Sequence, residues 1–197
     1  MKKTIMFILL LSAMTAVSYA QNYTVSALKG SWGCDAKRFI GATEDVEGVE
    51  FKNANLVFTF SDRTVNISMD LNMDAGSVSE FLMRIGARIQ VSAIPYQLSK
   101  DILTISKSPN KPVVDIYQFD LIADANTKAA LKAAGMTEAS LKEMMQQELA
   151  GQSFMQEGLN FDGEMTIESL TSTKLILSDK SGETMVFNRV SSSTPRR

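Results

Sequence analysis

The sequence predicts a mainly β protein, an antiparallel up-and-down β-barrel of about eight to ten strands with a helical insertion before the last three strands. Three observations support this fold class. Apolar residues alternate with polar residues in several runs, short turn sequences separate most of these runs, and one stretch near residues 127–150 has helical composition and spacing instead. Closing such a sheet on itself removes the exposed edges that an open sheet would present.

The clearest alternation lies in residues 65–73, where an apolar side chain occupies every second position with Asn, Ser or Asp between them. A period of two over this length predicts a strand with one apolar and one polar face. Residues 56–60 form the preceding strand, and Ser61-Asp62-Arg63 is a short hairpin connection. A second alternating run covers residues 85–93, and Pro95 is expected to bend or end that strand.

The other strands are shorter. A turn at residues 99–101 leads into a strand at 103–105, and residues 113–121 form a further strand after a loop that contains Pro109 and Pro112. The last three strands are expected at residues 164–169, 173–178 and 183–190.

The helical insertion is predicted at about residues 127–150. Residues 127–134 are rich in Ala, Lys and Leu, which favour helix, and Gly135 is a typical C-terminal cap. Thr137 can cap a second helix that ends at Gly151. We expect this second helix to bury one apolar stripe over an end or a wall of the barrel, formed by Leu141, Met144, Met145 and Leu149.

The first twenty residues are typical of an export signal. Lys2 and Lys3 precede an apolar run at residues 5–11, and the segment ends in Ser18-Tyr19-Ala20. The apolar run is far shorter than the ~20 residues that span a bilayer. We therefore expect a signal peptide at 1–20 with cleavage after Ala20, a barrel domain at 21–190, a disordered tail at 191–197, and a periplasmic or secreted protein without a membrane span.

Composition narrows the chemistry. The formal net charge of −2 argues against a nucleic-acid partner, which requires a concentrated basic surface. The chain has no histidine, which removes imidazole catalysis and the commonest zinc ligand. Cys34 is the only cysteine, so it cannot form an internal disulfide and is expected to be a small buried side chain. The sequence thus predicts neither an enzyme nor a cofactor or metal site.

Two short motifs carry a resemblance to a known family. Gly30-Ser31-Trp32 precedes the first long strand, and Arg189 lies in the last strand. In these positions the chain resembles the lipocalin-like, or calycin, β-barrels, in which a first-strand Gly-x-Trp is covered by an Arg from the last strand. The chain lacks the Thr-Asp-Tyr turn of typical lipocalins and places its helix before the last three strands. The resemblance therefore implies a divergent, exported bacterial branch.

The resemblance implies a barrel that binds a small apolar ligand. The inward residues of the two long alternating strands are the predicted ligand-binding set, with Ala87 central because its small side chain leaves space between larger neighbours; they are Val65, Ile67, Met69, Leu71, Ile85, Ala87, Ile89 and Val91. The alternative is a cell-envelope interaction module, whose barrel is filled by its own side chains and whose outer face binds protein or glycan. An enzyme that uses carboxylates inside the barrel has no specific support in the sequence.

Overall fold

The computed structural model describes residues 22–37, 48–76, 81–151 and 163–190. The predicted signal peptide and C-terminal tail lie outside these residues. The described strands are β1 (Gly30–Asp35), β2 (Val49–Phe60), β3 (Thr64–Ala75), β4 (Phe81–Ser99), β5 (Ile102–Ile105), β6 (Val113–Ala123), β7 (Gly163–Leu170), β8 (Lys174–Ser178) and β9 (Thr184–Val190). The described helices are α2 (Val25–Leu28), α4 (Ala125–Ala133) and α5 (Glu138–Gly151).

Eight of these strands form a closed antiparallel ring. Each strand of the ring pairs with the next along the chain, in the order β1-β2-β3-β4-β5-β7-β8-β9, and β9 returns to pair with β1. The helices α4 and α5 precede the last three strands. The predicted fold class, a mainly β up-and-down barrel with a helical insertion, is confirmed.

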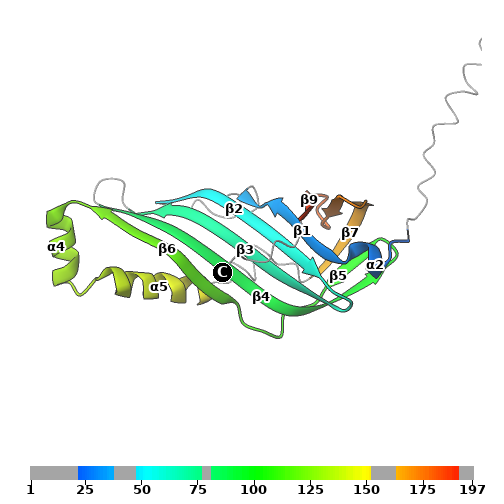
Figure 1. Cartoon of the computed structure of the whole chain (residues 1–197), viewed down its shortest axis with the longest axis horizontal. Coiled ribbons are helices and arrows are strands. Elements are labelled where there is room, and N and C mark those ends of the chain that lie inside the picture. Colours follow the sequence, from blue (N-terminus) through cyan, green and yellow to red (C-terminus); the bar gives the residue numbers. More distant parts are fainter. Residues whose placement is uncertain (1–21, 38–47, 77–80, 152–162, 191–197) are drawn as a thin grey trace, which may run out of the picture.

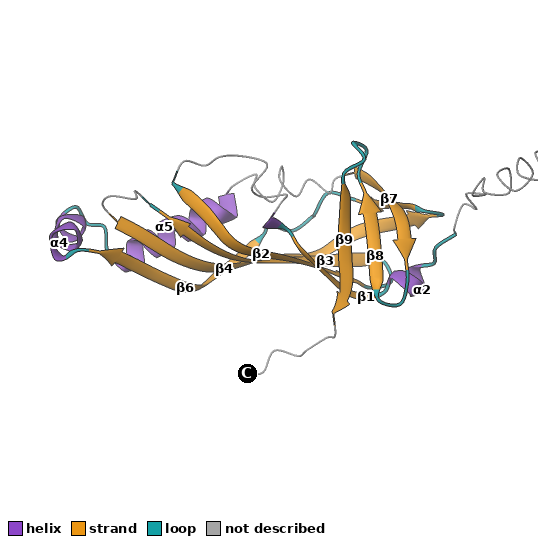
Figure 2. Ribbon diagram, turned by 90° about the horizontal axis from the view of Figure 1, so that it is seen from above, coloured by secondary structure: helices purple, strands orange, loops and turns teal. Residues whose placement is uncertain are grey.

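The molecule is elongated because the ring closes at one end only (Figures 1 and 2). At that closed end, the short strands β1, β5, β7, β8 and β9 complete the barrel. At the other end β2, β3 and β4 continue outward and β6, which lies outside the ring, pairs with the first half of β4. We call this second part the extension; it is an antiparallel sheet in the order β2-β3-β4-β6.

A bulge in β4 separates the closed end from the extension. On the edge opposite β3, residues 81–90 of β4 pair with β6, whereas residues 96–99 pair with β5. Between these segments Ala93 has a φ of 56°, and its N–H donates to Asn66 Oδ1 at 2.8 Å. Pro95 does not end the strand, which continues to Ser99. Proline has no N–H to donate to a continuous ladder of strand hydrogen bonds. The bulge breaks the ladder locally, so that β4 can continue past Pro95 and change its pairing partner.

Other boundaries differ modestly from the sequence prediction. β2 begins at Val49 rather than at residue 56, because a register shift between Phe51 and Asn53 breaks its alternation near the start. The two helices form where they were expected. The side chain of Asp124 caps α4 by accepting from the N–H of Thr127 at 2.7 Å, and Gly135 follows the helix with a φ of 78°.

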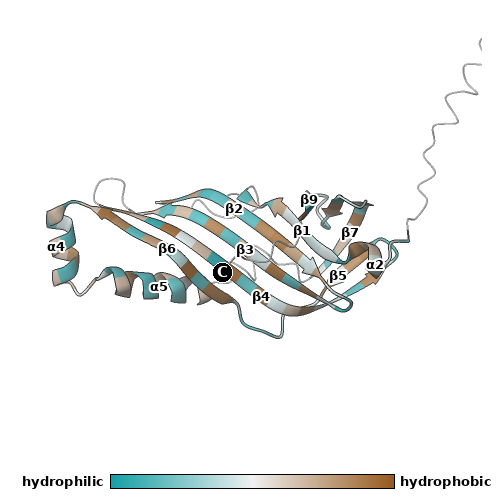
Figure 3. Ribbon diagram, viewed as in Figure 1, coloured by the Kyte–Doolittle hydropathy of each residue, from teal (hydrophilic) through white to brown (hydrophobic). Residues whose placement is uncertain are grey.

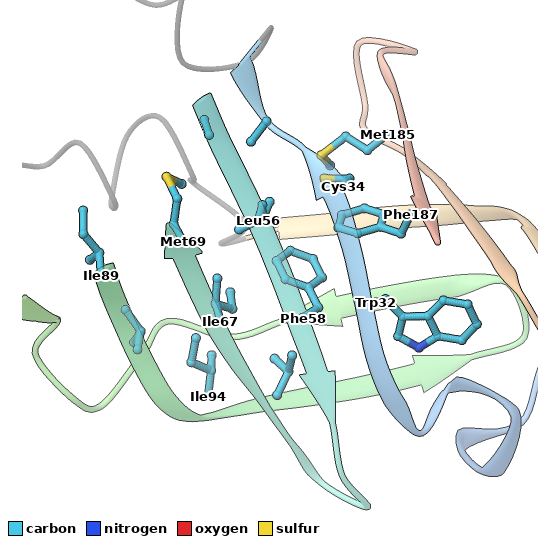
Figure 4. Close-up of a cluster of buried hydrophobic side chains, with 14 of the residues drawn as sticks. Trp32, Cys34, Leu56, Phe58, Ile67, Met69, Ile89, Ile94, Met185 and Phe187 are labelled. Atoms are coloured by element: carbon cyan, nitrogen blue, oxygen red, sulfur yellow. The ribbon is translucent and has the colours of Figure 1, made fainter. Parts of the chain in front are cut away.

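One hydrophobic core runs through both parts, but the two parts are filled differently. At the closed end the core combines aliphatic side chains with a cluster of aromatic rings. Phe58 and Phe187 lie side by side (Figure 4), with 5.0 Å between their ring centres. The ring centre of Phe60 lies 5.9 Å from that of Phe58 and 5.2 Å from that of Tyr96. These distances are typical of favourable ring packing. The aromatic rings and the aliphatic side chains around them therefore fill the interior of the closed end.

The outer face of β3 and β4 in the extension is largely polar, as the alternating hydropathy along these strands shows in Figure 3, whereas β6 exposes Val113, Tyr117 and Ile122. Across β3 and β4, Asp70 pairs with Arg88 and Asp74 with Arg84, and the Arg88 Nε donates to Asp70 Oδ1 at 2.8 Å. This arrangement leaves the opposite, inner face to the apolar half of each strand. Among the described helices, none combines the length and apolar character needed to cross a membrane.

Candidate functional site

The candidate site is the inner face of the extension. Strand register places its inward side chains in rows that cross the sheet from β2 to β6. Three successive rows, starting nearest the closed end, are Leu56-Met69-Ile89-Val114, then Ala54-Leu71-Ala87-Ile116, then Phe51-Met73-Ile85-Phe119. Every side chain in these rows is apolar, so the inner face offers shape and apolar surface rather than hydrogen bonds.

The middle row, which we call the alanine row, has the smallest side chains. It contains Ala54 and Ala87, both fully buried, whereas the rows on either side contain larger residues such as Met69 and Ile85. Protein interiors are normally packed to high density. Two alanines in one row therefore leave more space above the sheet there than the larger side chains of the adjacent rows do. The alanine row is the place on this face where an apolar guest displaces the least protein.

The structure divides the eight predicted ligand-binding residues between two environments. All of them are buried in the common core. Three lie toward the closed end: Val65 and Ile67 pair with the aromatic residues Phe60 and Phe58, and Val91 pairs with Ile67. The other five line the extension: Met69, Leu71, Ile85, Ala87 and Ile89. The predicted residues therefore form one continuous face. Three of them lie toward the closed end, and the other five line the extension.

Several residues of the inner face were not included in the sequence prediction. Ala54 was missed because the irregularity in β2 hides its alternation, and Val114 and Ile116 were missed because the pairing of β6 with β4 joins distant parts of the chain. The one available signal for Ala54 was its place as an apolar residue between Asn53 and Asn55.

Helix α5 runs along β6 on the inner side of the extension (Figures 1 and 2). Leu149 is buried in the core and Met145 packs against it, and Gln146 Nε2 donates to the carbonyl oxygen of Val114 at 3.0 Å. This hydrogen bond satisfies a main-chain acceptor on β6, the last strand in the sheet order. Covering such an edge with a helix is one way in which proteins protect it.

The predicted stripe of α5 is correct in part. Leu141 and Leu149 are buried, and Met145 is half-buried. Met144 is 53% exposed, so its assignment to the buried stripe is wrong. The two adjacent methionines lie about 100° apart around a helix, so a narrow contact with the sheet covers only one of them.

At the closed end, Trp32 and Arg189 form the contact expected from the motifs. They are register partners on β1 and β9, and Arg189 Cζ lies 4.2 Å from the centre of the Trp32 ring. The guanidinium also donates to the carbonyl oxygens of Lys29 at 2.9 Å and Ala27 at 3.1 Å. The Trp32 Nε1–H donates to Leu28 O at 2.7 Å, so the fully buried indole has its one polar group satisfied.

Gly30 is part of the same arrangement. Its φ of 112° is strained for other residues, and a Cβ atom at this position would lie 2.6 Å from Arg189 Nη1. A side chain at residue 30 would therefore displace the guanidinium from the indole. Both residues of the motif therefore support the contact between Arg189 and Trp32: the tryptophan provides the ring, and the glycine leaves space for the guanidinium.

Cys34 does not offer a reactive thiol. Burial, followed by the negative charge of Asp35, raises the pKa of Cys34 to about 12. Because the thiolate is the nucleophilic form, the Cys34 side chain is inert near neutral pH. Within the described residues no group of three or more Cys, Asp or Glu side chains is arranged to hold a metal ion.

Comparisons with protein-family models, with curated proteins and with solved structures found no match to this chain. The closed ring of eight strands is compatible with a lipocalin-like fold.

Proposed function

We propose that this chain is an exported, non-enzymatic, lipocalin-like protein that binds a small apolar ligand between the inner face of the extension and α5. The observation that carries this proposal is the alanine row. Ala54 and Ala87 are the smallest side chains on an apolar face that α5 flanks at β6, whereas the closed end is filled by aromatic and aliphatic side chains. Ligand sites of this kind are apolar and largely preformed, with few polar groups.

The same face limits the chemistry of the ligand. An ionised group placed against the rows of Leu, Met, Ala and Ile would lose its hydration without gaining a partner there. The part of the ligand that enters must therefore be uncharged, and any polar group must stay at the margin. Gln146, whose amide donates to the main chain of β6, is one polar side chain of α5 at this margin.

Export is supported by the sequence of residues 1–20, with its two lysines, its apolar run and its small residues before Gln21. N-terminal sequencing of protein isolated from its host should read Gln21 onward. An intact Met1 in that material would contradict export by this signal.

The second candidate function is an envelope interaction module with a filled barrel. The aromatic packing of the closed end favours it, because Phe58, Phe60 and Phe187 occupy the space that a central ligand would need. In this alternative the polar outer face of the sheet would meet a protein or glycan.

Native mass spectrometry of protein purified from its own host separates the two functions. The ligand-binding function predicts a co-purifying small molecule, or saturable binding of Nile red at one site by the emptied protein. If no small molecule is retained and neither Nile red nor fatty acids bind saturably, the ligand-binding function is wrong and the interaction module is favoured.

A further inference from the structure

We propose that α5, which packs on β6 at the inner side of the extension, lifts from β6 as a unit and so admits the ligand to the alanine row, whose β6 member is Ile116. The entry role rests on the proposed ligand-binding function, whereas the lifting of α5 is a property of the protein alone. Four observations support the proposal. Helix α5 has few buried side chains, α4 has none, and a glycine lies between the two helices. The hydrogen bond from α5 to β6 joins a side chain to a main-chain carbonyl.

The anchoring of α5 is slight compared with that of the strands beneath it. Among its described side chains Leu141 is 9% exposed and Leu149 is 7% exposed, and Met145 is only half-buried. In β3 every second side chain from Val65 to Ala75 is at most 5% exposed. Segments with few buried apolar contacts open locally at lower free-energy cost than the core strands do.

The segment before α5 does not hold it in place. Helix α4 has no buried residue along its length. Between the helices Gly135 has a φ of 78°, and a Cβ atom at this position would have no atom within 4 Å. The backbone at Gly135 is therefore sterically uncrowded, and its hydrogen bonds, from its N–H to Lys132 O at 3.0 Å and from Ser140 Oγ to its carbonyl oxygen at 3.3 Å, stay within the helical segment and do not tie it to the sheet.

The start of α5 is fixed within the helix itself. The Thr137 Oγ1 accepts from the N–H of Ser140 at 3.2 Å, and the N–H of Leu141 donates to the carbonyl oxygen of Thr137 at 2.9 Å. Since these bonds do not involve the sheet, they survive when the helix leaves it. We therefore expect α5 to move as a helix rather than to unwind first.

The hydrogen bond from Gln146 to Val114 O acts as a latch. It joins a side chain on α5 to the main chain of the edge strand, and both groups can bind water once they separate. Such an exchange has a small net free energy, so the latch biases α5 toward the closed position and still permits opening. The neighbouring Gln147 provides a matched comparison, because its amide contacts Glu143 on the same helix at 3.5 Å.

Hydrogen exchange of the full mature chain without ligand tests the opening. We expect amides of α5 to exchange faster than those of β3, and Gln146→Ala to accelerate exchange in α5 by about two- to tenfold. Gln147→Ala, which makes the same change in helix propensity, should leave exchange unaltered. Equal protection of α5 and β3, or equal behaviour of the two variants, would overturn the proposal.

Stopped-flow mixing with Nile red tests the entry role. If α5 gates the site, Gln146→Ala raises the association rate by a factor similar to its effect on exchange, and Gln147→Ala does not. Saturable binding at an association rate unaffected by Gln146→Ala would overturn the entry role and leave the binding function intact. Fast exchange in α5 without any saturable binding would instead contradict the binding function, while supporting the mobility of the helix.

Discussion

Arg189 lies over the ring of Trp32, with 4.2 Å between the guanidinium carbon and the ring centre, and this contact joins the first strand of the barrel to the last. The guanidinium also reaches two carbonyl oxygens in the segment that enters β1, at Ala27 and Lys29. The Arg189 side chain therefore joins β9 to β1 and to the segment that precedes β1.

Arg189→Ala should lower the free energy of unfolding by about 1–3 kcal/mol, since it removes the cation–π contact and two hydrogen bonds to main-chain carbonyls. Arg189→Lys should recover part of this loss, because lysine keeps the charge but not the planar fork of donors. Denaturant unfolding followed by the emission of Trp32, the single tryptophan, measures both effects. Asn188→Ala is the control. An unchanged midpoint and emission in Arg189→Ala would show that the contact does not contribute to stability.

Gly86 and Tyr117 form a second testable pair, on the outer face of the extension. A Cβ atom on Gly86 would lie 2.5 Å from Tyr117 Cε2, and the Tyr117 hydroxyl donates to Asn72 Oδ1 at 3.3 Å. Gly86→Ala should therefore displace the ring and lower stability by roughly 1 kcal/mol. In a Tyr117→Ala background the same change should cost less, because only the Gln118 Cβ atom, at 3.1 Å, remains close to the added methyl group. A double-mutant cycle without coupling would contradict the proposed contact.

Cys34 predicts a specific pH dependence. Its pKa is raised from 9.0 to about 12 in the folded protein, so above pH 9 the unfolded chain loses the thiol proton while the folded chain retains it. The resulting stabilisation is complete below pH 9 and is lost as pH rises toward 12. The stability difference between wild type and Cys34→Ala should therefore shrink over this range in denaturant titrations. A constant difference would show that the thiol is not shielded.

The sequence predicted local features well. Alternation located β3, the turn at Ser61-Asp62-Arg63 and most of β4, and composition located the helices, because each of these signals lies within a few neighbouring residues. The Gly-x-Trp motif and Arg189 indicated a contact between the chain's first and last strands. Why residue 30 must be glycine became clear only from the structure, in which the Arg189 guanidinium lies beside it.

The candidate site was predictable only in part, because it depends on pairing between distant segments. Ala87 could be singled out by its size, but its row also includes Ala54 on β2 and Ile116 on β6, and those neighbours follow from register. The bulge at Ala93, which lets β4 exchange β6 for β5, was indicated only by the nearby Pro95, which was expected to bend or end the strand. The alternation within single strands therefore predicted the apolar face. It did not predict that part of this face lies in the closed end and part in the extension.

Ala87 offers the most direct test of the ligand site. Ala87→Leu adds three heavy atoms to the alanine row, whereas Gln90→Leu places the same side chain on the exposed outer side of β4. Thermal unfolding of each variant first verifies that it is folded, and Ala54→Leu provides an independent second substitution in the same row. Overpacking of a buried site has a cost in stability of typically ~1–3 kcal/mol, so a stable protein should tolerate one such change.

The decisive measurement is the equilibrium affinity of Nile red for wild type, Ala87→Leu and Gln90→Leu under one set of conditions. A ligand bound on the alanine row predicts saturable binding to wild type, about tenfold or weaker binding to folded Ala87→Leu, because the added side chain takes the space of the guest, and unchanged binding to Gln90→Leu. Equal affinity in all three proteins, or no saturable binding in wild type, would contradict a ligand site between the extension and α5.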